Sequence, residues 1–254
     1  MGHLVILLGV LLAVAGQTLV QRLMPLPLRE SQTAAMGLIY AALYVMYGVT
    51  LAFSPFLVAQ AFATAQRTTE SEAGDVETLY RLAEQFPELK RHEIQELAGS
   101  YARVVVEEEW PMLGQGRASR ASPQAEALAN ELTESVEDFE PGTSSEQALY
   151  TQGLTLARDL EKDRDARLHE SRQGIPPLLW VVLVTGGVIT IAFTFFFGME
   201  TPWLHRLSVA GLTVVIVLVL YTIYRLDYPF SGAVQVGPDA FELVLQEIED
   251  DSER

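Results

Sequence analysis

Cysteine is absent from this chain of 254 residues, which excludes disulfides, thiol catalysis and thiolate metal sites together. The four histidines lie in separate segments, without the spacing of a zinc motif. The chain also lacks the GxSxG, P-loop and GxGxxG patterns of hydrolases and nucleotide-binding proteins. These absences predict a protein that is not an enzyme and that holds no cofactor and no metal.

Charge is absent from four long stretches of the sequence. Each stretch is long enough for a helix to cross a hydrocarbon core about 30 Å thick, which takes roughly 18 or more apolar residues. Ala13-Val14-Ala15 resembles a signal-peptide cleavage site, but no Lys or Arg precedes it, which favours a retained helix. We therefore expect an all-α, polytopic membrane protein with four transmembrane helices in two pairs, at residues 4–21, 31–66, 173–199 and 207–224.

The segment between the two pairs is acidic. The chain has a net charge of −16 at pH 7, and residues 65–175 hold 23 of its 33 acids. Such a surface repels nucleic acid, so we expect no nucleic-acid partner. The predicted domains are membrane helices 1 and 2 (1–66), a cytosolic acidic helical domain (67–172), membrane helices 3 and 4 (173–225) and a cytosolic tail (226–254).

Apolar residues in the acidic domain recur at the three- and four-residue steps of amphipathic helices. Val76, Leu79 and Phe86 form one such stripe before Pro87, and a second stripe continues to Val105. Ser122-Pro123 predicts the start of another helix through an N-cap and a first-turn proline. Thr143-Ser144-Ser145-Glu146 has the spacing of a capping box and predicts a further helix.

The second uncharged stretch is too long for a simple span. As a helix, residues 31–66 would reach about 54 Å at ~1.5 Å per residue, so we expect it to leave the membrane and to kink at Pro55. Its aromatic and polar residues are candidates for the lining of a pore. The alternative is that the tyrosines pack against other helices or form an interfacial belt. The candidate pore-lining residues are Tyr40, Tyr44, Tyr47, Phe53, Phe56 and Gln60.

Basic residues near the membrane ends predict the orientation, because cytoplasmic flanks are enriched in Lys and Arg. Placing the large loop inside leaves three bases outside, Arg22, Arg29 and Arg206. The inner flanks then hold six, so we expect the loop and both termini to be cytoplasmic. These six are Arg67, Lys162, Arg164, Arg167, Arg172 and Arg225.

Several motifs in a fixed order resemble the bacterial bestrophin-like family, integral membrane proteins with a domain of unknown function. The most specific pair is Glu109-Trp110-Pro111 followed by Leu226-Asp227 with Pro229-Phe230-Ser231-Gly232. The likeness covers residues from about 38 to 241. The motif positions are Glu72, Tyr101, Glu109, Trp110, Pro111, Arg167, Trp180, Asp227, Pro229, Phe230 and Gly232.

The family is in turn remotely similar to bestrophin channels. That resemblance implies a homo-oligomer, with a pentamer as the expected form, that conducts an inorganic ion across the bacterial inner membrane along its second helix. The segment after Phe230 lacks the acidic clasp of calcium-gated bestrophins, since its nearest acids are Asp239 and Glu242. The alternative is a non-conducting membrane scaffold or sensor whose acidic helical domain binds a partner.

Physical roles for two motif residues follow from their surroundings in the sequence. Asp227 comes directly after the fourth span, so we expect it to accept hydrogen bonds from backbone amides or to pair with Arg225 or a loop arginine. Trp110 precedes Pro111, so we expect it to end a helix and to fill an aromatic slot, with Glu109 paired nearby.

Overall fold

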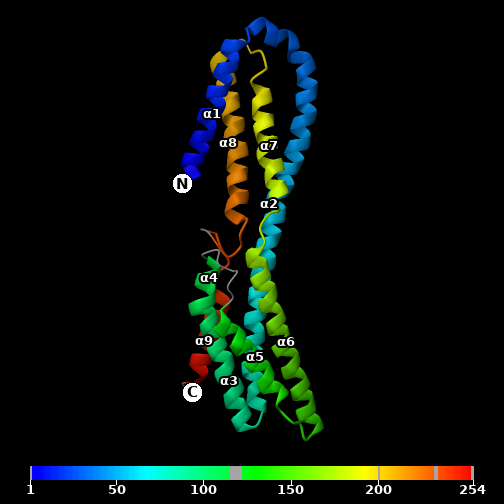
Figure 1. Ribbon diagram of the computed structural model, residues 1–254, viewed down its shortest axis with the longest axis vertical. Coiled ribbons are helices and arrows are strands. Elements are labelled where there is room, and N and C mark those ends of the chain that lie inside the picture. Colours follow the sequence, from blue (N-terminus) through cyan, green and yellow to red (C-terminus); the bar gives the residue numbers. More distant parts are fainter. Residues whose placement is uncertain (1, 115–121, 200, 232–233, 253–254) are drawn as a thin grey trace. The chain divides into compact units, whose positions relative to one another are not determined.

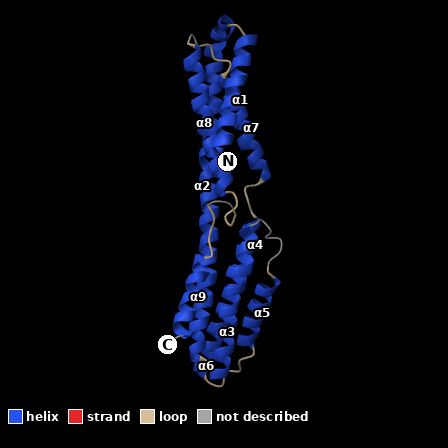
Figure 2. Ribbon diagram, turned by 90° about the vertical axis from the view of Figure 1, so that its left-hand side faces the viewer, coloured by secondary structure: helices blue, strands red, loops and turns tan. Residues whose placement is uncertain are grey.

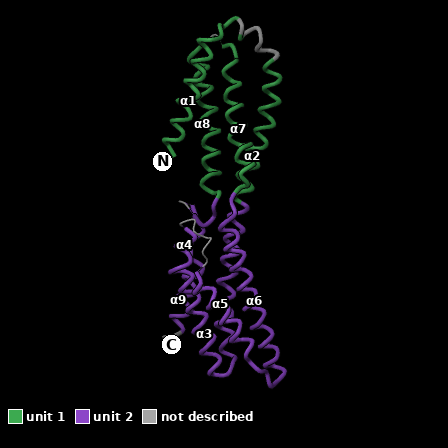
Figure 3. Tube along the Cα trace, in the orientation of Figure 1, with its two compact units in different colours: residues 1–59, 175–227 green, residues 60–174, 228–254 purple. Residues whose placement is uncertain are grey.

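Helices make up the regular structure of the part of the chain that the computed structural model describes, residues 2–114, 122–199, 201–231 and 234–252. Those residues include no strand, as Figure 2 shows, which confirms the predicted all-α class. The chain divides into two compact units (Figure 3). We call residues 1–59 with 175–227 the membrane unit, and residues 60–174 with 228–254 the helical unit.

The membrane unit contains α1 (Gly2–Leu23), the first part of α2 (Leu26–Leu82), α7 (Pro177–Thr194) and α8 (Pro202–Leu226) (Figure 1). Within the described residues, four helices are long and apolar enough to cross a membrane, which confirms the two predicted pairs. α1 packs against α8 and α7. α8 begins five residues earlier than the uncharged stretch predicted, and it therefore includes His205.

Tyr47 organises the packing between α2 and α7 in the membrane unit. It is buried, and its hydroxyl donates a hydrogen bond of 3.0 Å to the carbonyl oxygen of Leu183. Its ring lies over two glycines of α7, where a Cβ added to Gly186 would come within 2.5 Å of ring atom Cδ2. The core around this contact contains Leu51, Val58, Leu183, Ile216 and Ile223.

α2 is a single helix of 57 residues. It passes through Pro55 without interruption and continues well beyond the uncharged stretch, as expected for a helix that leaves the membrane. The stripe that begins at Val76 was expected to be an amphipathic helix, and it is helical to Leu82 as the continuation of α2. The polar segment 67–75 contains no proline, and one glycine, Gly74, is too weak a breaker to end a long helix.

The helical unit completes α2 and adds a 3₁₀ turn (Ala83–Gln85), α3 (Glu88–Val104), a π turn (Val105–Glu109), α4 (Trp110–Gly114), α5 (Pro123–Glu137), α6 (Ser144–Arg172) and α9 (Asp239–Ser252). α3 packs against α5 and α9, and α5 packs against α6. These helices bury a shared apolar core that includes Val76, Leu79, Ile94, Tyr101, Leu132 and Phe241.

Local capping chemistry sets two of these helix starts, as the sequence predicted. The Ser122 hydroxyl accepts a hydrogen bond from the Ala125 amide (3.3 Å), with Pro123 in the first turn of α5. The Thr143 hydroxyl accepts one from the Glu146 amide (3.2 Å) at the start of α6. Glu146 completes the cap by accepting from the Gly142 amide (2.8 Å), one residue earlier than in a standard capping box.

Candidate functional site

A π turn between α3 and α4 positions the acid of the Glu-Trp-Pro motif. The Trp110 amide donates to the carbonyl of Val105, five residues back instead of four. Pro111 follows without an N–H, so one hydrogen bond of the regular ladder is missing at this point. The extra residue in the turn moves the buried face of the helix, so Glu109 lies inside while Glu107 and Glu108 stay exposed. Such turns often occur at functional sites.

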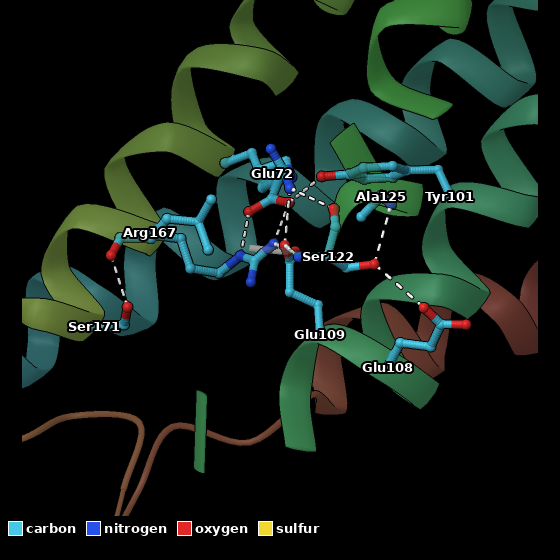
Figure 4. Close-up of polar contacts among 10 residues, drawn as sticks. Glu72, Tyr101, Glu108, Glu109, Ser122, Ala125, Arg167 and Ser171 are labelled. Atoms are coloured by element: carbon cyan, nitrogen blue, oxygen red, sulfur yellow. Dashed lines mark hydrogen bonds and ion pairs between the residues drawn. The ribbon is translucent and has the colours of Figure 1, made fainter. Parts of the chain in front are cut away.

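Two acids and two arginines meet inside the helical unit, and with Tyr101 they form what we call the buried charge network (Figure 4). Arg167 donates from Nε to Glu72 Oε2 (2.6 Å) and from Nη2 to Glu72 Oε1 (2.9 Å). Its Nη2 also donates to Glu109 Oε2 (2.8 Å). Arg164 Nη2 donates to the other oxygen of Glu109 (2.8 Å), and the Tyr101 hydroxyl donates to Glu72 Oε1 (2.5 Å).

The two carboxylates and the two guanidinium groups of this network balance in charge, and each ion stabilises its neighbours of opposite sign. Burial alone would raise the pKa of Glu109, but Arg167, Arg164 and the Ser122 amide outweigh burial and hold that pKa below its ordinary value. Burial would lower the pKa of Arg167, yet the Glu72 carboxylate raises it well above its ordinary value. Burial raises the pKa of Tyr101, with Glu72 adding to the rise, so Tyr101 remains a proton donor.

Aromatic rings enclose the Arg167 guanidinium. Its Cζ atom lies 5.2 Å from the centroid of the Trp110 ring and 5.9 Å from that of Phe241. Phe230 packs edge-on against Trp110 at 5.8 Å between centroids, and the indole N–H donates to the Val236 carbonyl (3.3 Å). Trp110 thus lies in an aromatic slot. The expectation that it ends a helix is wrong, because Trp110 begins α4, which includes Pro111 and continues to Gly114.

Asp227 and Trp180, two further motif positions, meet in the membrane unit. Asp227 Oδ1 accepts from the Ile175 amide (2.5 Å), and Oδ2 accepts from the Trp180 indole N–H (3.0 Å). The carboxylate therefore joins the end of α8 to the segment that starts α7. Arg225 instead donates to the Tyr221 hydroxyl (3.1 Å). In the helical unit the Pro229 carbonyl accepts from the Val236 amide (2.8 Å), while Gly232 lies outside the described residues.

The candidate pore-lining residues lie on two different faces of α2. Tyr47 is buried, and the Tyr40 ring packs against Phe197 at 5.2 Å between centroids. Tyr44 is 47% exposed beside Tyr40. At about 100° per residue, the other three candidates lie roughly opposite the tyrosines. They are all exposed, namely Phe53 (63%), Phe56 (61%) and Gln60.

The sequence did not reveal the partners within the buried charge network, although it singled out their positions. Glu72 and Arg167 are 95 residues apart, and charged residues in an acidic domain are ordinarily solvated. One signal was available: Glu72 lies between Ala65, Thr69, Val76 and Leu79 at the spacing of a buried helix stripe. A charge at a core position implies a buried partner of opposite sign.

The carboxylate oxygens of the network already accept hydrogen bonds from the two arginines, which limits the chemistry of this site. The carboxylates of the network are held by arginines, and the described residues contain no group of three or more His, Asp or Glu side chains that could hold a metal ion. The network therefore clamps three helices, α2, the π turn after α3, and α6, at a fixed register. Its ion pairs position these elements.

Comparisons with known proteins agree with this geometry. A bestrophin-like domain matches residues 7–241, whereas no curated protein sequence matches the chain. A crystal structure of a bacterial bestrophin homologue from Klebsiella pneumoniae is similar with a TM-score of 0.73 at 10% identity, over 98% of this chain and 99% of that one. A variant of that homologue with an Ile-to-Thr mutation gives a TM-score of 0.71 at 10% identity, over 96% of this chain and 99% of that one. This chain belongs to the bestrophin-like family.

Proposed function

We propose that this protein is one subunit of a homo-oligomeric ion channel in the bacterial inner membrane, and that the outward face of α2 lines the conduit. Family membership supports the channel activity, since bestrophins conduct ions. The observation that carries the choice of face is the exposure of Phe53, Phe56 and Gln60 on one side of a spanning helix. We leave out the tyrosines, because Tyr47 is bound to α7 of its own subunit.

The chemistry of this face suits a pore better than lipid. Aromatic rings in a narrow passage exclude ions by dewetting until the passage widens. Gln60, the first residue of the helical unit, continues this face of α2 with an exposed amide, which favours contact with water. The Thr64 hydroxyl, one turn further, donates to the Gln60 carbonyl (3.0 Å) and is also exposed.

Flux measurements on aromatic truncations test the proposal. In proteoliposomes, Phe53→Ala or Phe56→Ala should raise ion flux several-fold, because a smaller side chain wets the passage more easily. Tyr47→Ala is the matched control, since it removes a ring of similar size from the buried face of the same helix. It should lower the melting temperature without raising flux. Wild-type oligomers that pass no ion, together with silent Phe53 and Phe56 variants, would contradict the proposal.

One observation favours the alternative of a scaffold or sensor that binds a partner. A groove of ≈ 340 Å³ between α2 and α9 in the helical unit is lined by five acids and one arginine, which suits a basic peptide. Oligomers without flux that bind a Lys-rich peptide, and lose that binding in Glu84→Gln and Asp250→Gln, would favour this function. The acids are Glu77, Glu84, Glu247, Asp250 and Asp251.

A further inference from the structure

Two polar side chains inside the membrane unit have no hydrogen-bonding partner in the protein. Gln17 of α1 and Thr190 of α7 are both 0% exposed. Neither Nε2 nor Oε1 of Gln17 is paired, and Thr190 Oγ1 is unpaired as well. Other threonines of the spanning helices satisfy their hydroxyls locally. Thr18 donates to Val14 O (2.7 Å) and Thr213 donates to Val209 O (2.7 Å).

The neighbourhood of Gln17 is polar on one side. Gln21, one turn further along α1, lies 3.4 Å from His205 Nδ1 through its Nε2 atom. His205 Nε2 lies 2.9 Å from the Thr194 carbonyl oxygen of α7. A Cβ on Gly16 would come within 2.9 Å of the Phe195 ring, so α1 closely approaches the end of α7 at this level. Thr190 is little more than one turn before that end.

The unpaired atoms define the chemistry of what can satisfy them. A buried amide without a partner in a membrane interior costs several kcal/mol. Because both the N–H and the C=O of Gln17 are unpaired, the partner must accept one hydrogen bond and donate another. A halide only accepts and an alkali cation only coordinates oxygen, so neither satisfies both atoms. A lipid headgroup has no access to side chains that are fully enclosed.

We propose that Gln17 and Thr190 hold a buried water molecule between α1 and α7 within a single subunit. Water donates and accepts, and buried water typically makes about three hydrogen bonds to groups that otherwise lack partners. This site is separate from the conduit proposed on α2, and its presence does not depend on whether the protein conducts ions.

A structure that resolves ordered water gives the direct test. In the wild-type oligomer in lipid nanodiscs, we expect a density peak within about 2.7–3.2 Å of both Gln17 amide atoms. The peak should also lie within hydrogen-bond distance of Thr190 Oγ1, and it should weaken or vanish in Thr190→Val. A Gln17 amide bonded directly to protein carbonyls and amides, with no peak beside it, would overturn the proposal.

A double-mutant cycle tests the same site in solution. Gln17→Leu and Thr190→Val should each lower stability, and together they should cost less than the sum, with a coupling of about tenfold in the unfolding equilibrium constant. Thr213→Val is the matched control, because Thr213 is equally buried but already satisfied by Val209. It should combine additively with Gln17→Leu. If Gln17→Leu stabilises the protein and adds independently to Thr190→Val, the site is dry and the proposal fails.

Discussion

Arg167 occupies an unusual position for a charged residue. It is 0% exposed, makes three hydrogen bonds to two carboxylates and lies beside two aromatic rings. Desolvating such a group is expensive, so a buried ion pair contributes little net stability over an apolar replacement of the whole network. Removing only one member is different, because its partners are then left buried with uncompensated charge.

We therefore expect Arg167→Met to destabilise the protein by about 3–5 kcal/mol, since Glu72 loses the arginine that pairs with it and Glu109 loses one of its two arginine partners. Arg158→Met is the control, because Arg158 pairs with Glu137 on the surface, with 63% and 45% of the two side chains exposed. It should shift stability by less than about 1 kcal/mol. Thermal unfolding of the purified protein measures both. Equal shifts for the two variants would show that the network is not a clamp.

Asp75 makes folding stability depend on pH in the helical unit. Burial, with Asp163 and Asp159 nearby, raises its pKa to about 6, whereas an unfolded Asp titrates near 3.9. Between about pH 4 and 6 the folded state binds this proton more tightly. This contribution to stability therefore grows as the pH falls through 6, and it is lost as the pH rises again.

Asp75→Asn should remove this pH dependence. We subtract the melting temperature of the variant from that of the wild type, and this difference should be larger at pH 5 than at pH 7. Asp165→Asn, which alters an exposed acid of α6, should leave the wild-type pH dependence unchanged. If the Asp75→Asn and wild-type melting temperatures run parallel from pH 5 to 7, Asp75 does not carry the effect.

Single residues could be assigned from the sequence when their partners were close along the chain. Ser122 and Thr143 were identified as caps because a cap acts on amides two or three residues away. Glu72 and Arg167 were identified as motif positions, but their pairing was not, because nothing local joins residues 95 positions apart. Burial of the Glu109 carboxylate also depends on a π turn, which the sequence signals only through Pro111.

At the level of helices, the contact between α2 and α7 depends on the absence of side chains at two positions of α7. Gly186→Ala would place a methyl group 2.5 Å from the Tyr47 ring, which its hydrogen bond to Leu183 holds in place. We expect a cost of about 1–3 kcal/mol from overpacking. Gly211→Ala in α8 meets nothing within 4 Å and should be neutral or slightly stabilising. Detergent unfolding of both variants distinguishes them, and a loss of stability in Gly211→Ala alone would contradict this packing.

The spanning helices were predictable because an uncharged stretch of bilayer length leaves the backbone few alternatives to a helix. Their ends were less predictable. α2 continues through the polar segment 67–75 across the predicted domain boundary, because leaving the membrane does not require a helix to stop. The aromatic residues of α2 were treated as one group from their spacing, yet Tyr47 is buried against α7, whereas Phe53 and Phe56 lie on an exposed face.

For the whole molecule, the distribution of basic residues predicts that the helical unit lies in the cytoplasm. Ser145→Cys tests this in a chain without any other thiol. The site is exposed in the first turn of α6, so a membrane-impermeant maleimide should label it in opened vesicles but not in intact cells. Introducing Cys at Thr201, expected on the opposite side between α7 and α8, gives the control. Labelling of Ser145→Cys in intact cells would reverse the orientation.

The π turn after α3 contains one residue more than a regular helical turn would. The buried side of α3 and the buried side of α4 are joined through this extra residue. Deleting an exposed residue within the turn, such as Glu107, would return the helix to a regular pitch while Glu109 and Trp110 keep facing inward. A deletion in the regular part of α3 would instead rotate everything after it by about 100°. Insertions and deletions among relatives should therefore be tolerated at this turn, and the Glu-Trp-Pro motif should vary by one position in its distance from the preceding helix.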